Sequence, residues 1–237
     1  MVTQIHTVAN ELRRRIASGV YPPGERLVEL ALAAELGASR TPIRLAFEEL
    51  TKEGLLERLP TRGFRVKAFS ADDLADAIDV RGTLEGMAAR LAAERKPSDE
   101  QALSLKECVA QGRSILADAM ADDQHIDAAR WIAMNARFHS TLIEAAQNAA
   151  LAAAVSHVSK HPLAGAQALS HGIAPRLEFA LIQRAQQDHE DVVQSVLAGE
   201  GVRAEALMRE HARRSRDNKR ELLTGKHQPE PSAAPTR

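Results

Sequence analysis

The chain has 237 residues, a formal net charge of −1 and a hydrophobic content of 44%, which fits a globular protein with one large domain or two modest ones. Its single cysteine, Cys108, excludes an intramolecular disulfide and a multi-cysteine zinc finger. No stretch approaches the roughly 20 uninterrupted apolar residues of a membrane span and the N-terminal segment lacks the apolar core of a secretory signal, so we expect a cytoplasmic protein without membrane contact.

Residues 1–69 are expected to form a small domain of helices and a hairpin. Apolar periodicity and turn residues predict three helices, then two short strands, over about 3–18, 28–36, 40–52, 55–59 and 64–69. Ser39 is the expected N-cap of the third helix. Helix, helix, turn, helix and hairpin is the element order of a winged helix-turn-helix. This segment holds eleven Lys and Arg against eight Asp and Glu, a mild basic excess.

The rest of the chain is predicted to be helical, which makes the fold class mainly α. Six helices are expected, over about 70–95, 99–121, 124–146, 148–158, 175–198 and 202–223. Ser98 with Gln101 has the spacing of a capping box. We therefore predict a DNA-binding domain over 1–69, an all-helical bundle over 70–223 and a disordered tail over 224–237.

The third helix has the features of a DNA-reading element. Its apolar stripe of Ile43, Phe47 and Leu50 is expected to pack inward, against Leu12, Leu32 and Leu36. Arg40, Thr41 and Arg44 then point outward near the helix N-terminus, the end that a recognition helix places against base edges. Arginine suits guanine, and hydroxyls suit phosphate. Taken singly, these arginines also fit an ordinary solvated face.

Five segments share their spacing with a known family: Pro23–Leu27, Glu29–Gly37, Ser39–Arg44, Glu53–Leu55 and Arg62–Val66. In this pattern the chain resembles the GntR superfamily of bacterial transcription regulators. The resemblance implies DNA contacts by Ser39, Arg40, Thr41, Arg44, Arg62 and Gly63. Two residues depart from the family pattern, Leu45 and Phe47. Since Phe47 faces the core, its change should not alter base reading.

Three histidines interrupt the apolar stripes of three different predicted helices. They are His139, His189 and His211, and Asn135 lies one turn before His139. Three imidazoles and an amide oxygen inside a bundle can hold a divalent transition metal with positions open for a ligand. Buried, hydrogen-bonded core histidines are the alternative, because periodicity alone does not show that the three residues converge.

Residues from about 72 to 222 resemble the FCD ligand-binding domain of one GntR branch. The resembling segments are Arg81–Glu85, Ala88–Ala93, Asn135–His139, Asp188–Glu190 and Ala206–His211. The resemblance implies a metal site of Asn135, His139, His189 and His211, with Asn135 in place of the usual aspartate. Zinc is favoured by the imidazole count, and nickel and manganese are possible. Losing the aspartate charge should favour an anionic effector. The spacing over 156–166 resembles the vanillate-repressor-like branch.

Arg81 and Glu85 lie one turn apart in the first helix of this domain. They form either a surface ion pair worth about 0.3–0.5 kcal/mol or, as the family resemblance implies, part of the effector site. Together these features predict a ligand-responsive transcription regulator rather than an enzyme. It would bind double-stranded operator DNA as a homodimer and be released as a repressor by a small carboxylate. The alternatives are a metal-dependent hydrolase that uses the three histidines, and a helical scaffold with a DNA tether.

Overall fold

The computed structural model describes residues 2–17, 19–60, 63–68, 70–159 and 174–223. The chain divides into two compact units. The first contains Met1–Ser70 and Ser156–Ala168, and the second contains Ala71–Val155 and Leu169–Arg237. The predicted disordered tail, 224–237, lies outside the described residues.

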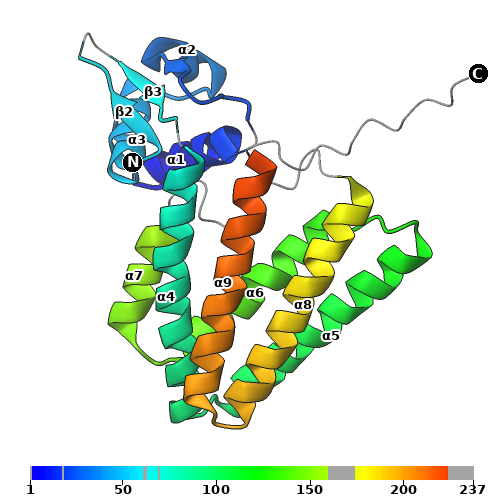
Figure 1. The fold of residues 1–237 in the computed structure, drawn as a ribbon. Coiled ribbons are helices and arrows are strands. Elements are labelled where there is room, and N and C mark those ends of the chain that lie inside the picture. Colours follow the sequence, from blue (N-terminus) through cyan, green and yellow to red (C-terminus); the bar gives the residue numbers. More distant parts are fainter. Residues whose placement is uncertain (1, 18, 61–62, 69, 160–173, 224–237) are drawn as a thin grey trace, which may run out of the picture. The chain divides into compact units, whose positions relative to one another are not determined.

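The first unit has the elements expected of a winged helix-turn-helix. In chain order they are α1 (Val2–Ala17), β1 (Arg26–Leu27), α2 (Glu29–Glu35), α3 (Arg40–Lys52), β2 (Leu56–Arg58) and β3 (Phe64–Val66) (Figure 1). The strands form an antiparallel sheet in the order β1-β3-β2. The predicted hairpin is present but shorter. Strand β1 was not predicted, because two residues carry no measurable alternation.

The core of the first unit joins α3 to the other helices and to the sheet. Ile43, Phe47 and Leu50 are buried together with Leu12 and Leu32, and Leu36 packs at the edge, as the apolar stripe predicts. The rings of Phe47 and Phe64 lie 5.0 Å apart between α3 and β3. Packing therefore fixes the inner face of α3 and turns its opposite face to solvent.

The second unit is a bundle of helices. Its elements are α4 (Ala71–Arg95), α5 (Asp99–Ala121), α6 (Ala128–Ala145), α7 (Ala149–Ser159, whose last residues are grouped with the first unit), α8 (Pro175–Leu197) and α9 (Gly201–Leu223). Five of them close a ring, because α4 packs on α9, α9 on α8, α8 on α5, α5 on α6 and α6 on α4 (Figure 1). The most extensive of these contacts is that of α4 with α9. The mainly helical fold class is confirmed.

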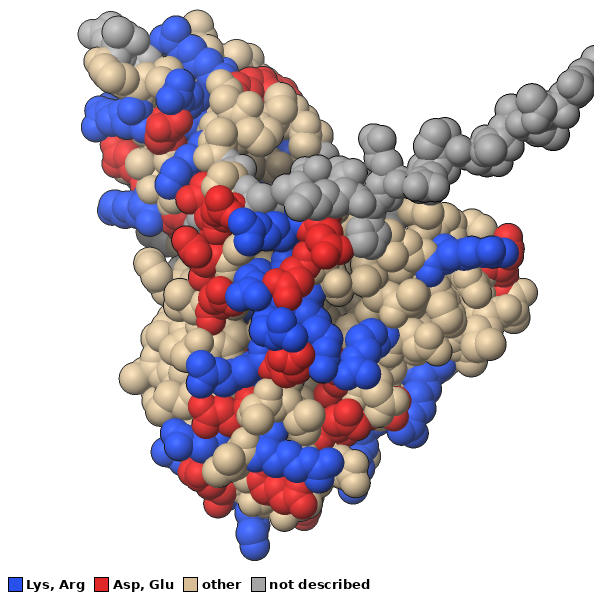
Figure 2. Space-filling view, in the orientation of Figure 1, with Lys and Arg blue, Asp and Glu red and all other residues tan. Residues whose placement is uncertain are grey.

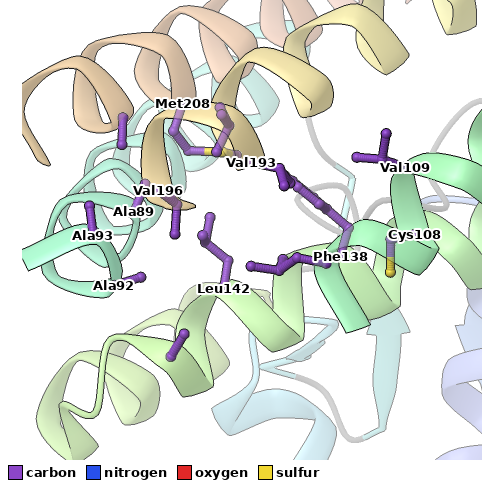
Figure 3. Close-up of a cluster of buried hydrophobic side chains, with 14 of the residues drawn as sticks. Ala89, Ala92, Ala93, Cys108, Val109, Phe138, Leu142, Val193, Val196 and Met208 are labelled. Atoms are coloured by element: carbon purple, nitrogen blue, oxygen red, sulfur yellow. The ribbon is translucent and has the colours of Figure 1, made fainter. Parts of the chain in front are cut away.

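The interior of the ring is filled by aliphatic side chains. Figure 3 shows residues of all five ring helices turned toward one another, among them Ala89, Cys108, Leu142, Val196 and Met208. A smaller cluster, which includes Leu151 and Val155 of α7, packs α7 on α4 and α6. A side chain on the inner stripe of a ring helix therefore enters a common interior.

Helix ends agree with the sequence in one case and differ in two. Ser98 starts α5 with the expected capping box: its side chain accepts from the backbone of Gln101, whose side chain accepts from the backbone of Ser98. Helix α6 begins at Ala128 rather than near 124, because Asp123 and Gln124 have positive φ and Asp127 provides the cap. Ser39 holds the predicted N-cap position of α3, but its side chain makes no capping hydrogen bond.

Candidate nucleic-acid interface and metal centre

The outer face of α3 carries the predicted DNA contacts of this helix. Ser39, Arg40, Thr41 and Arg44 are all exposed. Because the apolar stripe is buried, these four side chains share the solvent face of the first two turns. Donors at a helix N-terminus favour contact with phosphate, since the backbone N–H groups there have no partner within the helix.

Arg40 makes one ion pair on this surface. Its guanidinium lies 3.5 Å from a carboxylate oxygen of Glu29 on α2, and 68% of its side chain is exposed. A surface pair of this kind contributes little to stability, with a median of about 0–1 kcal/mol. Arg40 can therefore leave Glu29 for another anionic partner at small cost.

The turn between β2 and β3 carries the two remaining predicted contacts. Gly63 has a φ of 102°, a backbone conformation that side-chain-bearing residues rarely adopt. Its carbonyl accepts a hydrogen bond from the backbone N–H of Leu59, which closes the base of the turn. Arg62 lies outside the described residues, so its role as a contact stays a prediction.

The second unit brings the three predicted histidines together. His139 comes from α6, His189 from α8 and His211 from α9, and one ligand atom of each lies within 4.8 Å of the others. The ring centroids are 4.8 to 5.7 Å apart. Two nitrogens that share a zinc ion at about 2.0–2.1 Å lie at most about 4 Å from each other. The cluster is therefore close to the spacing that one ion requires.

The surroundings of His189 fit the role of a metal ligand. Both of its ring nitrogens are buried and have no hydrogen-bond partner among the described residues. Buried polar atoms are normally paired, so two orphaned nitrogens on one ring need an explanation. Burial lowers the pKa of His189, and the charges of His211 and His139 lower it further; burial also lowers the pKa of His211, although its contact with Asp188 opposes that shift. Burial therefore favours the neutral form of both rings, which is the form that binds metal.

Arg81 and Glu85 lie inside the bundle, so the surface-pair interpretation was wrong. Both residues of the pair are buried on α4, and the Arg81 Nε lies 3.6 Å from the Glu85 Oε2. The same carboxylate oxygen is 3.3 Å from the Nδ1 of His139. Burial alone would raise the pKa of Glu85, but the charges of His139 and Arg81 outweigh it and hold the pKa below its usual range. Glu85 thus links Arg81 to the histidine cluster.

Asn135, the predicted fourth ligand, lies on α6 one turn before His139 and is half-buried. This register gives it the same side of the helix as His139. Its coordination of a metal stays a prediction, as do the roles of Arg81 and Glu85 toward an effector.

Charges of both signs alternate on the face of the second unit formed by α4 and α9 (Figure 2). Arg216 of α9 makes a 2.8 Å ion pair with Asp79 of α4, and Arg90 of α4 lies 3.3 Å from Glu205 of α9. These pairs leave no extended basic field there, so this face does not resemble a phosphate-binding surface. Among the described helices, none has the length and apolar character needed to cross a membrane.

Comparison with known proteins identifies both units. Residues 4–66 match the model of the gntR family of bacterial regulatory proteins, and residues 76–214 match that of the FCD domain. A "Probable D-xylose utilization operon transcriptional repressor" of Paenarthrobacter nicotinovorans is 33% identical, over 86% of this chain and 85% of its own length. The chain belongs to the GntR family. The "HTH-type transcriptional repressor GlaR" of Escherichia coli is 26% identical, over 84% of this chain and 88% of its own length.

A solved structure agrees with this GntR-family fold. E. coli McbR/YncC superposes with a TM-score of 0.71 at 21% identity, over 96% of this chain and 100% of that chain. The GntR-family protein described here is a DNA-binding transcription regulator with a ligand-responsive helical domain, and it is not an enzyme. The hydrolase alternative finds no support. The comparisons also give no support to a vanillate-repressor-like subtype, and residues 160–166 of that segment lie outside the described residues.

Sequence reasoning missed several side chains around the histidine cluster of this GntR-family protein. Asp188, adjacent to His189, is buried and contacts His211. The ring of His189 stacks on those of Trp131 and Phe138, at centroid distances of 5.8 and 4.0 Å. For Asp188 the available signal was a carboxylate beside a candidate ligand on an inner helix stripe. The aromatic neighbours read as ordinary core residues.

Lys219, near the end of α9, was also missed. Burial lowers its pKa to about 7, and the nearby Arg81 lowers it while Glu85 raises it. Lys219 therefore lies close enough to Arg81 for their charges to interact. A guanidinium and a lysine that a nearby negative charge would help to protonate make this part of the bundle a candidate site for an anion.

Proposed function

We propose that this regulator is a repressor, released from its operator when a small carboxylate binds beside a metal ion held by His139, His189 and His211. The observation that carries the proposal is the convergence of three imidazoles from three helices within 4.8 Å. An unpaired buried polar group costs about 1–3 kcal/mol. A bound metal ion would give one ring nitrogen of His189 the partner that the described residues do not supply. Two of the relatives are described as transcriptional repressors, which supports that direction of regulation.

The proposed ion is zinc, because three neutral imidazoles are a common zinc ligand set. Nickel and manganese are the alternatives, since imidazole also suits other divalent transition metals. Asn135 is the proposed fourth ligand through its amide oxygen. When bound, the ion supplies a positive centre with positions open to an oxygen ligand. The neutral amide leaves that centre more electropositive than the aspartate usual in the family.

The proposed effector site joins this centre to Arg81. A guanidinium presents two parallel N–H groups that match a carboxylate. Lys219 lies in the same region, where burial and then Arg81 lower its pKa to about 7, so a bound anion would favour its charged form. Glu85 lies 3.6 Å from Arg81 and is proposed to hold it in place while the effector is absent. Arg81, a metal ion and a lysine that an anion would help to protonate favour an anion over a neutral ligand.

On the DNA side, we propose a homodimer that presents two α3 helices to a pseudo-palindromic operator. Ser39, Arg40, Thr41 and Arg44 would contact one half-site, with Arg62 and Gly63 at the adjacent backbone or groove. The two-fold symmetry of such a dimer sets the half-site spacing. Because a bacterial transcription regulator must reach the chromosome, we also propose that the protein acts in the cytoplasm.

The coupling between the two sites follows from linkage. A carboxylate weakens operator binding only as far as it binds the DNA-free state more tightly than the DNA-bound state. A typical coupling of about 1–3 kcal/mol corresponds to a change of about 5–150-fold in operator affinity.

The test begins with the metal content of the full chain by mass analysis, followed by operator gel shifts with and without small carboxylates. We expect about one divalent ion per chain, bound at the single proposed site, and a carboxylate-dependent loss of the shifted band. His139→Ala should lose the metal and the carboxylate response, whereas His157→Ala, at an exposed position on α7, should retain both. A metal-free wild-type protein with an unimpaired response would contradict the metal centre and favour a scaffold-like bundle.

A further inference from the structure

Each of two histidines in the cluster has a buried carboxylate beside its Nδ1. For His211 the partner is Asp188, whose Oδ2 lies 3.4 Å from the ring nitrogen. The other oxygen of Asp188 accepts a 2.7 Å hydrogen bond from Arg214 and lies 3.2 Å from Arg184. The two arginines hold one oxygen of the carboxylate, which leaves the other oxygen directed at His211.

For His139 the partner is Glu85, on α4. The Glu85 Oε2 lies 3.3 Å from the His139 Nδ1, and both atoms are buried. Neither atom makes a hydrogen bond within the described residues, because the 3.3 Å approach lacks hydrogen-bond alignment. Arg81, 3.6 Å away, is a second charged neighbour of this oxygen, and the charges of His211 and Lys219 also act on Glu85. A hydrogen bond between His139 and Glu85 therefore needs a change of alignment and almost no change of distance.

These contacts decide which ring nitrogen is free for a metal. An ionised carboxylate only accepts hydrogen bonds, so the nitrogen that faces it must carry the proton. A neutral imidazole has one protonated and one unprotonated nitrogen, and only the unprotonated one can bind a metal. We propose that Glu85 and Asp188 are positioning residues, which fix the proton of His139 and His211 on Nδ1 so that both rings offer Nε2 to the metal.

His189 is held in a different way. Its ring stacks on Phe138 at 4.0 Å and 23° and on Trp131 at 5.8 Å and 6°, and neither ring nitrogen makes a hydrogen bond to a described residue. Its orientation comes from ring packing, so the proposed assignment covers His139 and His211. Carboxylates orient two of the ligands and aromatic rings orient the third. Substituting a carboxylate should therefore affect His139 or His211 but not the orientation of His189.

The two carboxylates also bear on the missing charge of Asn135. A carboxylate that accepts from a ligating histidine makes the ring a stronger donor to the metal, and loss of such a partner typically lowers metal affinity about 10–100-fold. Glu85 and Asp188 place two negative charges directly behind two of the three imidazoles. They strengthen two of the rings as donors, while the arginines paired with both carboxylates leave the centre the extra positive charge that follows from Asn135.

The first experiment measures the tautomers directly. It rests on the proposed metal centre and uses long-range ¹H–¹⁵N NMR of the zinc-loaded full chain, with ring signals assigned by single histidine substitutions. We expect a proton on Nδ1 and metal on Nε2 for both His139 and His211. Coordination through Nδ1 of either ring would overturn the inference and leave the metal centre standing. Failure of the wild-type chain to bind zinc would instead refute the proposed centre and the inference with it.

The second experiment separates positioning from a merely structural role. Asp188→Ala should weaken zinc binding about 10–100-fold in chelator competition, and Asp188→Asn, which keeps an acceptor oxygen, should recover part of the loss. The matched control is Arg214→Met, which removes the strongest ion-pair partner of Asp188 but leaves its contact with His211. We expect this control to keep the wild-type tautomer and zinc affinity. If Arg214→Met weakens zinc as much as Asp188→Ala, the carboxylate acts through the ion pair and the proposal fails.

Glu85 is tested in the same way, with Glu85→Gln as the variant that keeps an acceptor and Glu85→Leu as the one that removes it. The Leu variant should lose zinc affinity and the fixed Nδ1 proton of His139, while His211 keeps its own. An unchanged His139 signal in Glu85→Leu would overturn the role of Glu85. Should either apolar variant fail to fold, the wild-type tautomers still decide the proposal.

Discussion

The outer face of α3 and the histidine cluster both carry the proposed chemistry of this protein, but they are built in opposite ways. The four side chains of α3 lie within six consecutive residues, Ser39–Arg44, and all four are exposed. The cluster draws His139, His189 and His211 from three helices and Glu85 from a fourth, and packs them within the core. These exposed side chains can therefore be substituted without disturbing the fold. The cluster shares its atoms with the hydrophobic core, so its function and stability are coupled.

The largest effect should come from Phe138, which belongs to both the core and the cluster. Phe138→Ala removes a fully buried ring that stacks on His189, so we expect a loss of about 3–5 kcal/mol in the free energy of unfolding. Denaturant unfolding followed by circular dichroism measures it. Leu103→Ala, at an exposed position on α5, is the control and should change stability by no more than about 0.5 kcal/mol. Equal stability losses in the two variants would contradict the view that the histidine cluster is part of the hydrophobic core.

Metal removal should affect the second unit alone. A ligand present at about 1,000 times its Kd stabilises the folded state by about 4 kcal/mol, so stripping zinc with a chelator should lower stability by that amount. Hydrogen exchange locates the effect: protection should fall in α6, α8 and α9, which carry the histidines, and stay constant in α3. Loss of protection in α3 as well would show that the two regions do not respond separately.

Arg44→Ala should have the reverse profile. If Arg44 reads a base, its loss costs about 1–3 kcal/mol in specific operator binding, while unfolding should change by no more than about 0.5 kcal/mol because the side chain is exposed. Arg213→Ala removes an exposed arginine of α9 that is paired with Glu210, and it should leave operator binding unchanged. Gel shifts on specific and scrambled DNA measure both. Equal weakening on the two DNAs would limit Arg44 to phosphate contact.

The smallest expected effect comes from substituting two serines at helix N-caps, one in each unit. The Ser98 side chain accepts a hydrogen bond from the Gln101 backbone, whereas the Ser39 side chain caps nothing. Ser98→Ala should cost about 1 kcal/mol of stability, and Ser39→Ala should cost less but weaken operator binding if its hydroxyl contacts phosphate. Thermal unfolding and gel shifts on both variants distinguish them. A larger stability loss for Ser39→Ala than for Ser98→Ala would show that the Ser39 side chain does stabilise its helix.

The sequence predicted the first unit well because its signals are local. Helix α3 has the predicted bounds, and its buried stripe of Ile43, Phe47 and Leu50 follows directly from helical periodicity. Strand β1 was not predicted, because it is only two residues long. It forms by pairing with β3, which is distant in the sequence. The sequence also did not predict the late start of α6, because the residue types of Asp123 and Gln124 do not specify their positive φ.

In the second unit, periodicity predicted that the histidines lie on inner stripes but not how they meet. Whether His139, His189 and His211 converge depends on how three helices are rotated in the ring, which no single helix specifies. The same limit applied to Arg81 and Glu85, since their spacing fits a surface pair as well as the buried pair observed. The contact of Asp188 with His211 joins α8 to α9, so it becomes visible only when the helices are packed.

Trp131, stacked on His189, is the one tryptophan of the chain. Its indole therefore reports on the histidine cluster without any label, and every change in the intrinsic emission at long wavelength comes from this position. Nickel, whose d shell is incomplete, should quench this emission on binding, while zinc, with a filled d shell, should shift it without strong quenching. A single cuvette titration thus distinguishes an occupied centre from an empty one and separates zinc from nickel.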